Sequence, residues 1–123
     1  MLPELDAVRL RHILESAEEA AGYISNRTRE DLETDRPLVH SLVRCVEIIG
    51  EAARNVSSET RGAHTDVPWS KIVGMRNRLI HGYFDINFSI LWRTVSEELP
   101  VLAERLRKML AESEEPPMPS DDS

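Results

Sequence analysis

The sequence is poor in cysteine, in aromatic residues and in long apolar runs. Cys45 is its only cysteine, so no disulfide can form within the chain. The apolar neighbours of Cys45 predict a small buried side chain and not a nucleophile. Charged residues interrupt every apolar stretch within a turn, whereas a membrane-spanning helix needs about 20 consecutive apolar residues. We therefore expect neither a disulfide-stapled fold nor a membrane protein.

A secretion signal is also missing from the start of the chain. Residues Met1 to Asp6 lack the basic patch and apolar stretch that are typical of such signals, so we expect a cytoplasmic protein. The length of 123 residues, with 41% of them hydrophobic, suits one domain with one core. We assign residues 1–111 to a helical bundle domain. Residues 112–123, rich in acids, prolines and serines, are expected to form an acidic disordered tail.

The chain also lacks an excess of positive charge, since its net charge is -7. This argues against a uniformly basic nucleic-acid-binding surface. The charge is uneven, however, since between Lys71 and Arg93 four cationic residues stand against one acid, Asp85. Such a basic island can bind a phosphate locally, because charges act over about 8 Å at physiological salt. The alternative is that the surface charges are unevenly spread without any function.

Apolar residues recur at helical spacing through most of the chain, and no strand pattern or internal repeat is present. Asp35 with Pro37 and Asp66 with Pro68 are typical helix starts, and Asp85 or Asn87 can cap the last helix. The polar residues 57–67 predict a loop or a frayed turn. The expected helical segments are about 4–25, a short turn from 28 to 31, 35–57, 68–82 and 87–110.

These segments predict an all-α fold, an antiparallel four- to five-helix bundle with short connections. Gly82 is a plausible end for the helix before it, because glycine tolerates the left-handed conformation that commonly ends helices. Pro100 lies within the last helix and is expected to kink it. Trp69 and Trp92 are expected to pack in the core or in a dimer interface.

The segment from Arg76 to Tyr83 combines groups that phosphodiester chemistry uses. Histidine titrates near neutrality, so His81 can exchange a proton with a ribose hydroxyl or a leaving oxygen. The guanidinium of Arg76 suits a phosphate oxygen whose charge grows in the transition state. Asn77 can position a phosphate, and Tyr83 can stack on a base. RNA supplies its own nucleophile, the 2′-hydroxyl, so the pattern needs no metal and no cofactor.

The spacing of these residues limits how they can meet. On one regular helix, Arg76 and His81 would lie roughly 140° apart around the axis. They can converge only if the helix unwinds near Gly82 or if a second copy of the helix contributes. A two-fold homodimer supplies that copy, so we predict a composite site in a cleft between protomers. The plainer alternative is that both are surface residues, with His81 favoured at a helix C-terminus by the helix dipole.

Two separated stretches of the sequence resemble one known family. Residues 75–87, Met-Arg-Asn-Arg-Leu-Ile-His-Gly-Tyr-Phe-Asp-Ile-Asn, are similar to the signature of HepT-like proteins in the HEPN superfamily, which reads Arg, four residues, His, any residue, Tyr. The upstream run Glu47 to Ala53 resembles the second-helix pattern of that family, and residues 68–74 resemble its approach to the motif. The resemblance covers roughly residues 4–111.

The resemblance implies a metal-independent endoribonuclease toxin of a type VII-like toxin–antitoxin pair. In such proteins the motif lies at a homodimer cleft, so Arg76 and His81 inherit the catalytic roles. An antitoxin partner, an MNT-type nucleotidyltransferase, would silence the toxin by transferring AMP to the motif tyrosine, here Tyr83. Charge added beside the cleft would oppose its positive field. Asn77, Arg78 and Glu51 are supporting candidates.

Other interpretations of the same residues remain open. Glu51 can hold Arg76 or His81, or it can pair with neighbours on a solvated face of its own helix. The protein can be a catalytically inactive HEPN dimer that binds nucleotide or RNA, or that regulates its nucleotidyltransferase partner. It can also be a helical scaffold without either activity. His12, His40 and His64 show no ligand spacing, so we expect no metal site.

Overall fold

The computed structural model describes residues 2–81 and 85–114, most of which are helical. The helices are α1 (Glu4–Ile24), α2 (Asp31–Thr34), α3 (Arg36–Arg54), α4 (Ser58–Ala63), α5 (Trp69–Val73), α6 (Met75–Leu79), α7 (Phe88–Arg93), the π-helix η1 (Thr94–Glu98) and α8 (Leu99–Glu114).

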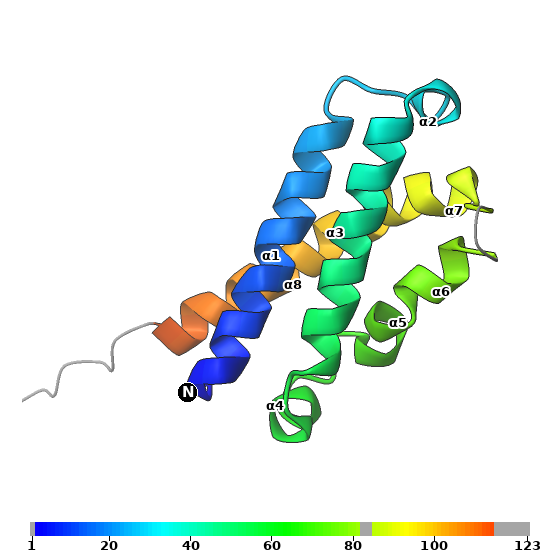
Figure 1. Ribbon diagram of the computed structural model, residues 1–123. Coiled ribbons are helices and arrows are strands. Elements are labelled where there is room, and N and C mark those ends of the chain that lie inside the picture. Colours follow the sequence, from blue (N-terminus) through cyan, green and yellow to red (C-terminus); the bar gives the residue numbers. More distant parts are fainter. Residues whose placement is uncertain (1, 82–84, 115–123) are drawn as a thin grey trace, which may run out of the picture.

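The helices form a bundle around the paired helices α1 and α3. Figure 1 shows α1 and α3 side by side and running in opposite directions, with α8 crossing behind α1. Helices α5 and α6 pack on α3, and the continuous rod α7–η1–α8 returns along the bundle to end near the N-terminus. At that end, Leu2 N donates to Ser113 Oγ over 3.2 Å. The predicted all-α helical bundle is confirmed.

One hydrophobic core holds these elements together. The buried positions of α3 recur with the helical period and therefore lie on one face of the helix. This face packs against α1 and α5. Cys45 is one of them, and burial, with a smaller contribution from Glu19, raises the pKa of its thiol to about 11. The largest fully buried side chains are those of Leu10, Ile13, Leu32, Leu42, Ile49, Ile72, Leu79, Leu91, Leu99, Leu106, Val46 and Val56.

Several helix starts follow the predicted capping residues. The Asp35 side chain accepts a hydrogen bond from Leu38 N over 3.1 Å at the start of α3, and Asn87 accepts from Ile90 N over 3.0 Å at the start of α7. The short turn after α1 is helix α2, where Thr28 N donates to Asp31 Oδ2 over 2.9 Å. Asp35 and Asn87 each satisfy a backbone N–H that their helix leaves unpaired, whereas Asp31 binds the chain just before α2.

The structure differs from the predicted elements in three places. The predicted loop 57–67 contains α4, which Ser57 caps by accepting from Thr60 N. The predicted helix 68–82 is two short helices separated at Gly74, and the second ends at Leu79. Glycine disfavours a helix interior, which accounts for a break there. Helix α8 extends to Glu114, so the first residues of the predicted tail are helical, while residues 115–123 lie outside the described range.

Both tryptophans pack inward. Trp69 is buried and donates from Nε1 to the His64 carbonyl oxygen over 2.9 Å, and Trp92 packs against the core while partly exposed.

Of the residues described, no helix has both the length and the apolar character to cross a bilayer.

A buried carboxylate fastens α1 to the start of α4, which the sequence did not indicate. Asp6 is only 2% exposed. It accepts from Ser57 N over 3.0 Å, from Ser57 Oγ over 2.6 Å and from Thr60 Oγ1 over 2.5 Å. Burial acts to raise the pKa of Asp6, but these hydrogen bonds outweigh it and the pKa is lowered.

We predict that Asp6→Ala lowers the free energy of unfolding by about 1–3 kcal/mol, because it strands buried donors of Ser57 and Thr60. Urea denaturation measures the difference. Asp66→Ala, which truncates an exposed aspartate side chain, is the matched control and is expected to stay within about 0.5 kcal/mol of the unmodified protein. Equal stabilities of the two variants would show that the Asp6 cluster contributes nothing.

Candidate active site

Helix α6 ends before the motif histidine, and the chain then reverses direction. Ile80 has extended backbone angles, φ -110° and ψ 117°, and forms an antiparallel bridge with Ile86. His81 N donates to the Asp85 carbonyl oxygen over 2.6 Å, and Asn87 N donates to the Leu79 carbonyl oxygen over 2.8 Å. These bonds fix the backbone of His81 in an extended segment instead of on a helix.

The early end of α6 changes the geometry of the motif. The predicted helix end at His81 or Gly82 is wrong, because the described helix stops at Leu79. The predicted 140° separation of Arg76 and His81 around a common axis therefore does not apply. Unwinding near Gly82, one of the two alternatives for bringing these residues together, does occur, and it begins at Ile80. The imidazole of His81 is exposed at the edge of the bundle.

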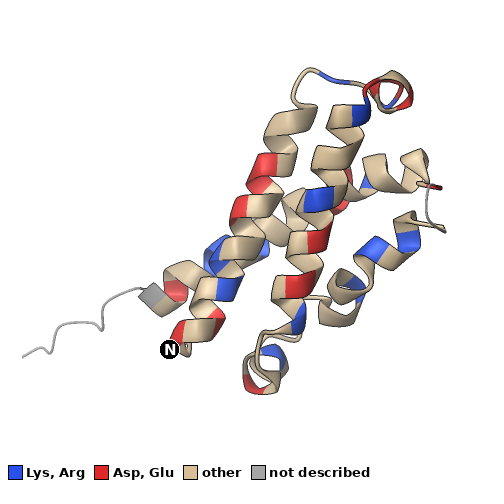
Figure 2. Ribbon diagram, viewed as in Figure 1, with Lys and Arg blue, Asp and Glu red and all other residues tan. Residues whose placement is uncertain are grey.

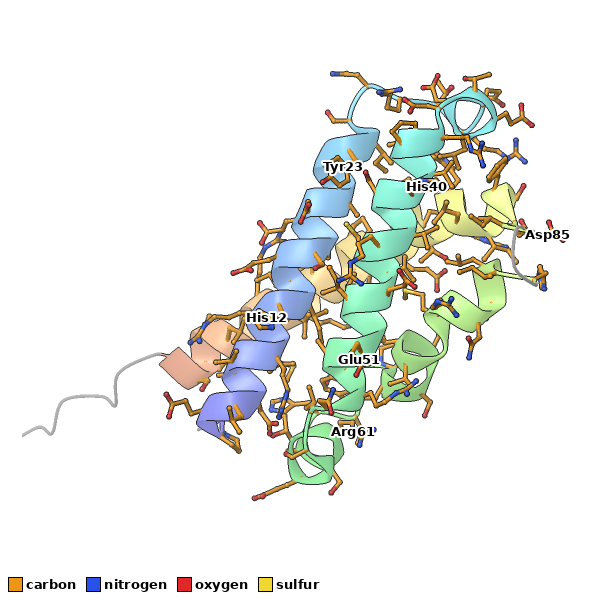
Figure 3. The ribbon with its side chains drawn as sticks, viewed as in Figure 1. His12, Tyr23, His40, Glu51, Arg61 and Asp85 are labelled. Atoms are coloured by element: carbon orange, nitrogen blue, oxygen red, sulfur yellow. The ribbon has the colours of Figure 1, made fainter. Side chains whose placement is uncertain are left out.

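Arg76 faces α3. Its Nε lies 3.0 Å from Glu47 Oε2, and the Arg76 side chain is half exposed. The carboxylate that holds Arg76 is therefore Glu47 and not Glu51, the predicted supporting residue one turn further along α3. Figure 3 shows Glu51 nearer the C-terminal end of α3 and Asp85 beyond the end of α6. Glu51 is close to Asn55, whose Nδ2 lies 3.4 Å from Glu51 Oε1.

A groove of about 820 Å³ lies between the α5–α6 segment and the rod η1–α8, with His81 on its lining. Figure 2 shows that the charged residues of α5 and α6 are all cationic. The opposite wall contributes cations and acids, and apolar side chains line the groove between them. The charged lining residues are Lys71, Arg78, Arg93, Arg105, Glu97 and Glu98, and the apolar ones are Pro68, Ile72, Met75, Ile90, Val101 and Leu102.

Glu98 joins the two walls of this groove. Its Oε1 lies 2.7 Å from Lys71 Nζ and 3.5 Å from Arg78 Nη2, and its Oε2 accepts from Thr94 Oγ1 over 3.2 Å. Burial acts to raise the pKa of Glu98, but the hydrogen bond from Lys71, the charge of Arg78 and the Thr94 hydroxyl together lower it. Glu98 is therefore an anion at ordinary pH and neutralises part of the cationic wall.

The rod that carries Glu98 is wound as a π-helix at this point. Leu99 N donates to the Thr94 carbonyl oxygen, five residues earlier, and Pro100 follows directly. Pro100 was expected to kink this helix, and the structure has a π turn just before it. Such turns insert an extra residue into one turn of helix and are frequent at functional sites. Here the turn contains both Glu97 and Glu98, which line the groove.

The predicted site residues fall into two groups within one chain. His81 and Arg78 line the groove, whereas Arg76 lies outside it and pairs with Glu47. Asn77 is exposed on α6. Tyr83, the predicted AMP acceptor, lies outside the described residues, as does Gly82. Among the described residues of one chain, Arg76 is therefore not part of the lining of the His81 groove, and the composite site between two protomers stays a prediction.

The fold and the groove define a class of protein, a small helical bundle. In it, the histidine that follows α6 lines a groove together with several arginines. The sequence model of the family described as Ribonuclease HepT-like matches residues 13–109 of the chain. The protein belongs to this HepT-like family.

Three relatives illustrate the match. A protein of Caldanaerobacter subterraneus subsp. tengcongensis named "Putative RNase" is 41% identical over 82% of this chain and 90% of its own length. "Probable ribonuclease HepT" of Thermococcus cleftensis is 36% identical over 78% of this chain and 91% of its own. "Gamma-glutamylcyclotransferase and putative RNase" of Methanocaldococcus jannaschii is 35% identical over 85% of this chain but 47% of its own length. No solved structure matches the chain.

We predict that Glu98→Gln lowers the free energy of unfolding by about 1 kcal/mol at neutral pH, because Lys71 and Arg78 lose their shared anion and both are partly exposed. Folding lowers the pKa of Glu98, so its carboxylate stabilises the protein above the ordinary pKa of 4.5. That contribution is lost as the pH falls through the folded value. Thermal unfolding between pH 7 and pH 3 should therefore bring the two proteins together at acid pH.

The control for this series is Glu97→Gln, which removes the neighbouring, exposed carboxylate of the same π turn. Its stability should follow that of the unmodified protein across the pH range. A gap between the Glu98→Gln variant and the unmodified protein that stays constant down to pH 3 would contradict the assigned ion pairs.

Proposed function

We propose that this protein is a metal-independent endoribonuclease that acts as the toxin of a type VII-like toxin–antitoxin pair. The observation that carries the proposal is the position of His81, whose exposed imidazole stands on an extended segment at a groove lined by cations. Membership of the HepT-like family and the RNase names of its relatives support RNA as the substrate.

The proposed reaction uses the RNA's own nucleophile. The imidazole of His81 takes the proton of a ribose 2′-hydroxyl, and the resulting oxyanion attacks the adjacent phosphorus. The bond from phosphorus to the 5′-oxygen breaks, and His81 returns the proton to that leaving oxygen. The products are a 2′,3′-cyclic phosphate and a 5′-hydroxyl. The Arg76 guanidinium stabilises the charge that grows on the other phosphate oxygens.

Because Arg76 and His81 do not share a groove within one chain, the proposed site is composite. In a two-fold dimer, Arg76 of one protomer would face His81 of the other, and each dimer would hold two such sites. The ion pair with Glu47 orients the Arg76 side chain in the free chain. A phosphate has to compete with this carboxylate, which is feasible because both side chains are partly exposed and exposed ion pairs are weak.

One observation favours a second candidate function. Arg76 already has an anionic partner in Glu47, and a dimer that keeps this pair would bind nucleotide or RNA without cleaving it. The protein would then be a binding or regulatory partner of a nucleotidyltransferase.

Cleavage of RNA in excess EDTA separates the two functions. We expect the purified full chain to cut single-stranded RNA with the chelator present, and His81→Ala and Arg76→Ala each to lose at least about 100-fold in rate, as for lost acid–base or electrostatic catalysis. Arg54→Ala, an exposed arginine at the end of α3, is the control. RNA that stays intact at high protein concentration, yet is bound, would support the binding function.

Mixing the two inactive variants tests whether the site is composite. If Arg76 and His81 come from different protomers, a heterodimer of Arg76→Ala and His81→Ala chains contains one complete site and one doubly defective site. Random exchange of subunits should then restore about one quarter of the unmodified activity. A mixture that remains inactive, although light scattering shows that subunits have exchanged, would place both residues in one chain.

The proposed regulation concerns Tyr83. A nucleotidyltransferase of the MNT type would transfer AMP to its phenol, and the added phosphate would oppose binding of RNA near the cationic residues. Intact-mass spectrometry after co-expression with such an enzyme should show one or more added AMP groups, absent from Tyr83→Phe. An unmodified tyrosine would remove this mode of control and leave the ribonuclease proposal standing.

A further inference from the structure

One wall of the groove is a single stripe along the rod α7–η1–α8. Arg93, Glu97, Val101 and Arg105 all line the groove and recur every four residues. The stripe is therefore one helical face with an arginine at each end. At about 1.5 Å per residue, the two arginines lie roughly 18 Å apart along the rod, enough for a short stretch of extended nucleic acid.

The cations of the two walls differ in whether they have an anionic partner. On the α5–α6 wall, Lys71 and Arg78 both pair with Glu98. On the rod, Arg105 donates from Nη1 to the uncharged carbonyl oxygen of Asp66 over 2.7 Å. Among the described residues, no acid within 4.0 Å neutralises Arg93 or Arg105. Glu97 of the stripe likewise has no cation within 4.0 Å among the described residues, so the two cations on each side of the groove stand against one acid. The cations of the rod, which no acid pairs, lie at the two ends of the stripe.

The middle of the groove offers hydrogen-bond donors and apolar surface. The Arg78 atoms Nε and Nη2 are buried and find no hydrogen-bond acceptor in the part of the chain that the structure describes. The Arg78 side chain as a whole is 39% exposed, so the accessible part of its guanidinium can donate to a phosphate oxygen. Val101 is 52% exposed despite its size, and it lines the groove together with the partly buried Ile90. These side chains can contact the faces of unpaired bases.

We propose that this groove is the strand-binding subsite of the enzyme, and that it holds single-stranded RNA on one side of the bond cut at His81. Backbone phosphates lie against Arg93, Arg78 and Arg105, and the bases contact Val101 and Ile90. The assignment rests on the proposed ribonuclease function and extends it, because Arg93, Val101 and Arg105 lie outside the Arg76–Tyr83 segment. The arginines are positioning residues, since they act on binding and not on the reacting atoms.

The charges favour a nucleic acid over a second copy of the chain as the occupant. The four cations of the lining exceed its two acids, Glu97 and Glu98. A two-fold contact through this face would place two surfaces of net positive charge against each other, and that repulsion opposes association. A polyanion instead gains from every one of them. An apolar helix would leave the arginines at both ends of the stripe without partners.

The test measures binding of a fluorescent single-stranded oligonucleotide whose 2′-positions are methylated, so that no nucleophile is present. The Arg93→Ala/Arg105→Ala double variant should bind about tenfold more weakly in fluorescence anisotropy. A plot of log affinity against log salt should lose about 0.7 of slope for each phosphate contact removed. The matched control is Arg54→Ala/Lys108→Ala, which removes the same charge from exposed positions outside the groove.

Two further measurements keep the result interpretable. Arg105→Lys keeps the charge and should retain most of the affinity, which distinguishes charge from the hydrogen bond that Arg105 makes to the Asp66 backbone. With cleavable RNA, the double variant should raise KM about tenfold and leave kcat within about twofold. A loss of kcat at unchanged KM would overturn the subsite, because it would place the arginines in the chemical step.

Three other outcomes would each change the assignment of the groove or of the function. Unchanged binding and salt slope in the double variant, with normal cleavage by the unmodified protein, would overturn the subsite and leave the ribonuclease intact. A double variant that changes from dimer to monomer in light scattering would make the groove an interface between copies. Absence of cleavage by the unmodified protein, with arginine-dependent binding, would instead remove the proposed function and keep the groove as an RNA-binding surface.

Discussion

The backbone reversal after α6 decides where the chemistry of this protein can take place. Two hydrogen bonds, His81 N to the Asp85 carbonyl and Asn87 N to the Leu79 carbonyl, tie the end of α6 to the start of α7. Ile80 and Ile86 pair between them and pack against the core. A helix continued through His81 would turn its imidazole around the α6 axis. The extended segment instead holds it at the groove between the two walls.

The same reversal sets the register of the returning rod. Asn87 both accepts the Ile90 N–H and donates to Leu79, so α7 begins where the reversal ends. From there the π turn places Glu98 opposite Lys71 and Arg78. The partly buried carboxylate holds two cations that would otherwise repel each other, and it thereby fixes the distance between the walls. Its charge also limits the field of the α5–α6 wall, whereas the arginines of the rod have no acid within 4.0 Å among the described residues and remain available to a polyanion.

The local features were predictable where one residue governs one local structure. Asp35 and Asn87 cap helices as expected, because a cap involves only a side chain and a backbone N–H three residues later. The amphipathic face of α3 was equally clear. The end of α6 was not, since Arg76 to His81 reads as a continuous helix and the pairing of Ile80 with Ile86 depends on residues further along the chain. Nothing in the sequence indicated that Asp6 is buried and hydrogen-bonded, because its partners are more than fifty positions away.

The sequence by itself determined the helical class, the positions of the long helices and the family motif, because hydrophobic period, caps and a short signature are all written locally. Only the tertiary structure decided which carboxylate meets which cation. Glu47 and Glu51 share one face of α3 in the sequence, yet the packing of α6 against α3 selects Glu47 for Arg76. It also separated Arg76 from the groove of His81. The rotation of one helix against another depends on the whole core, and no local pattern encodes it.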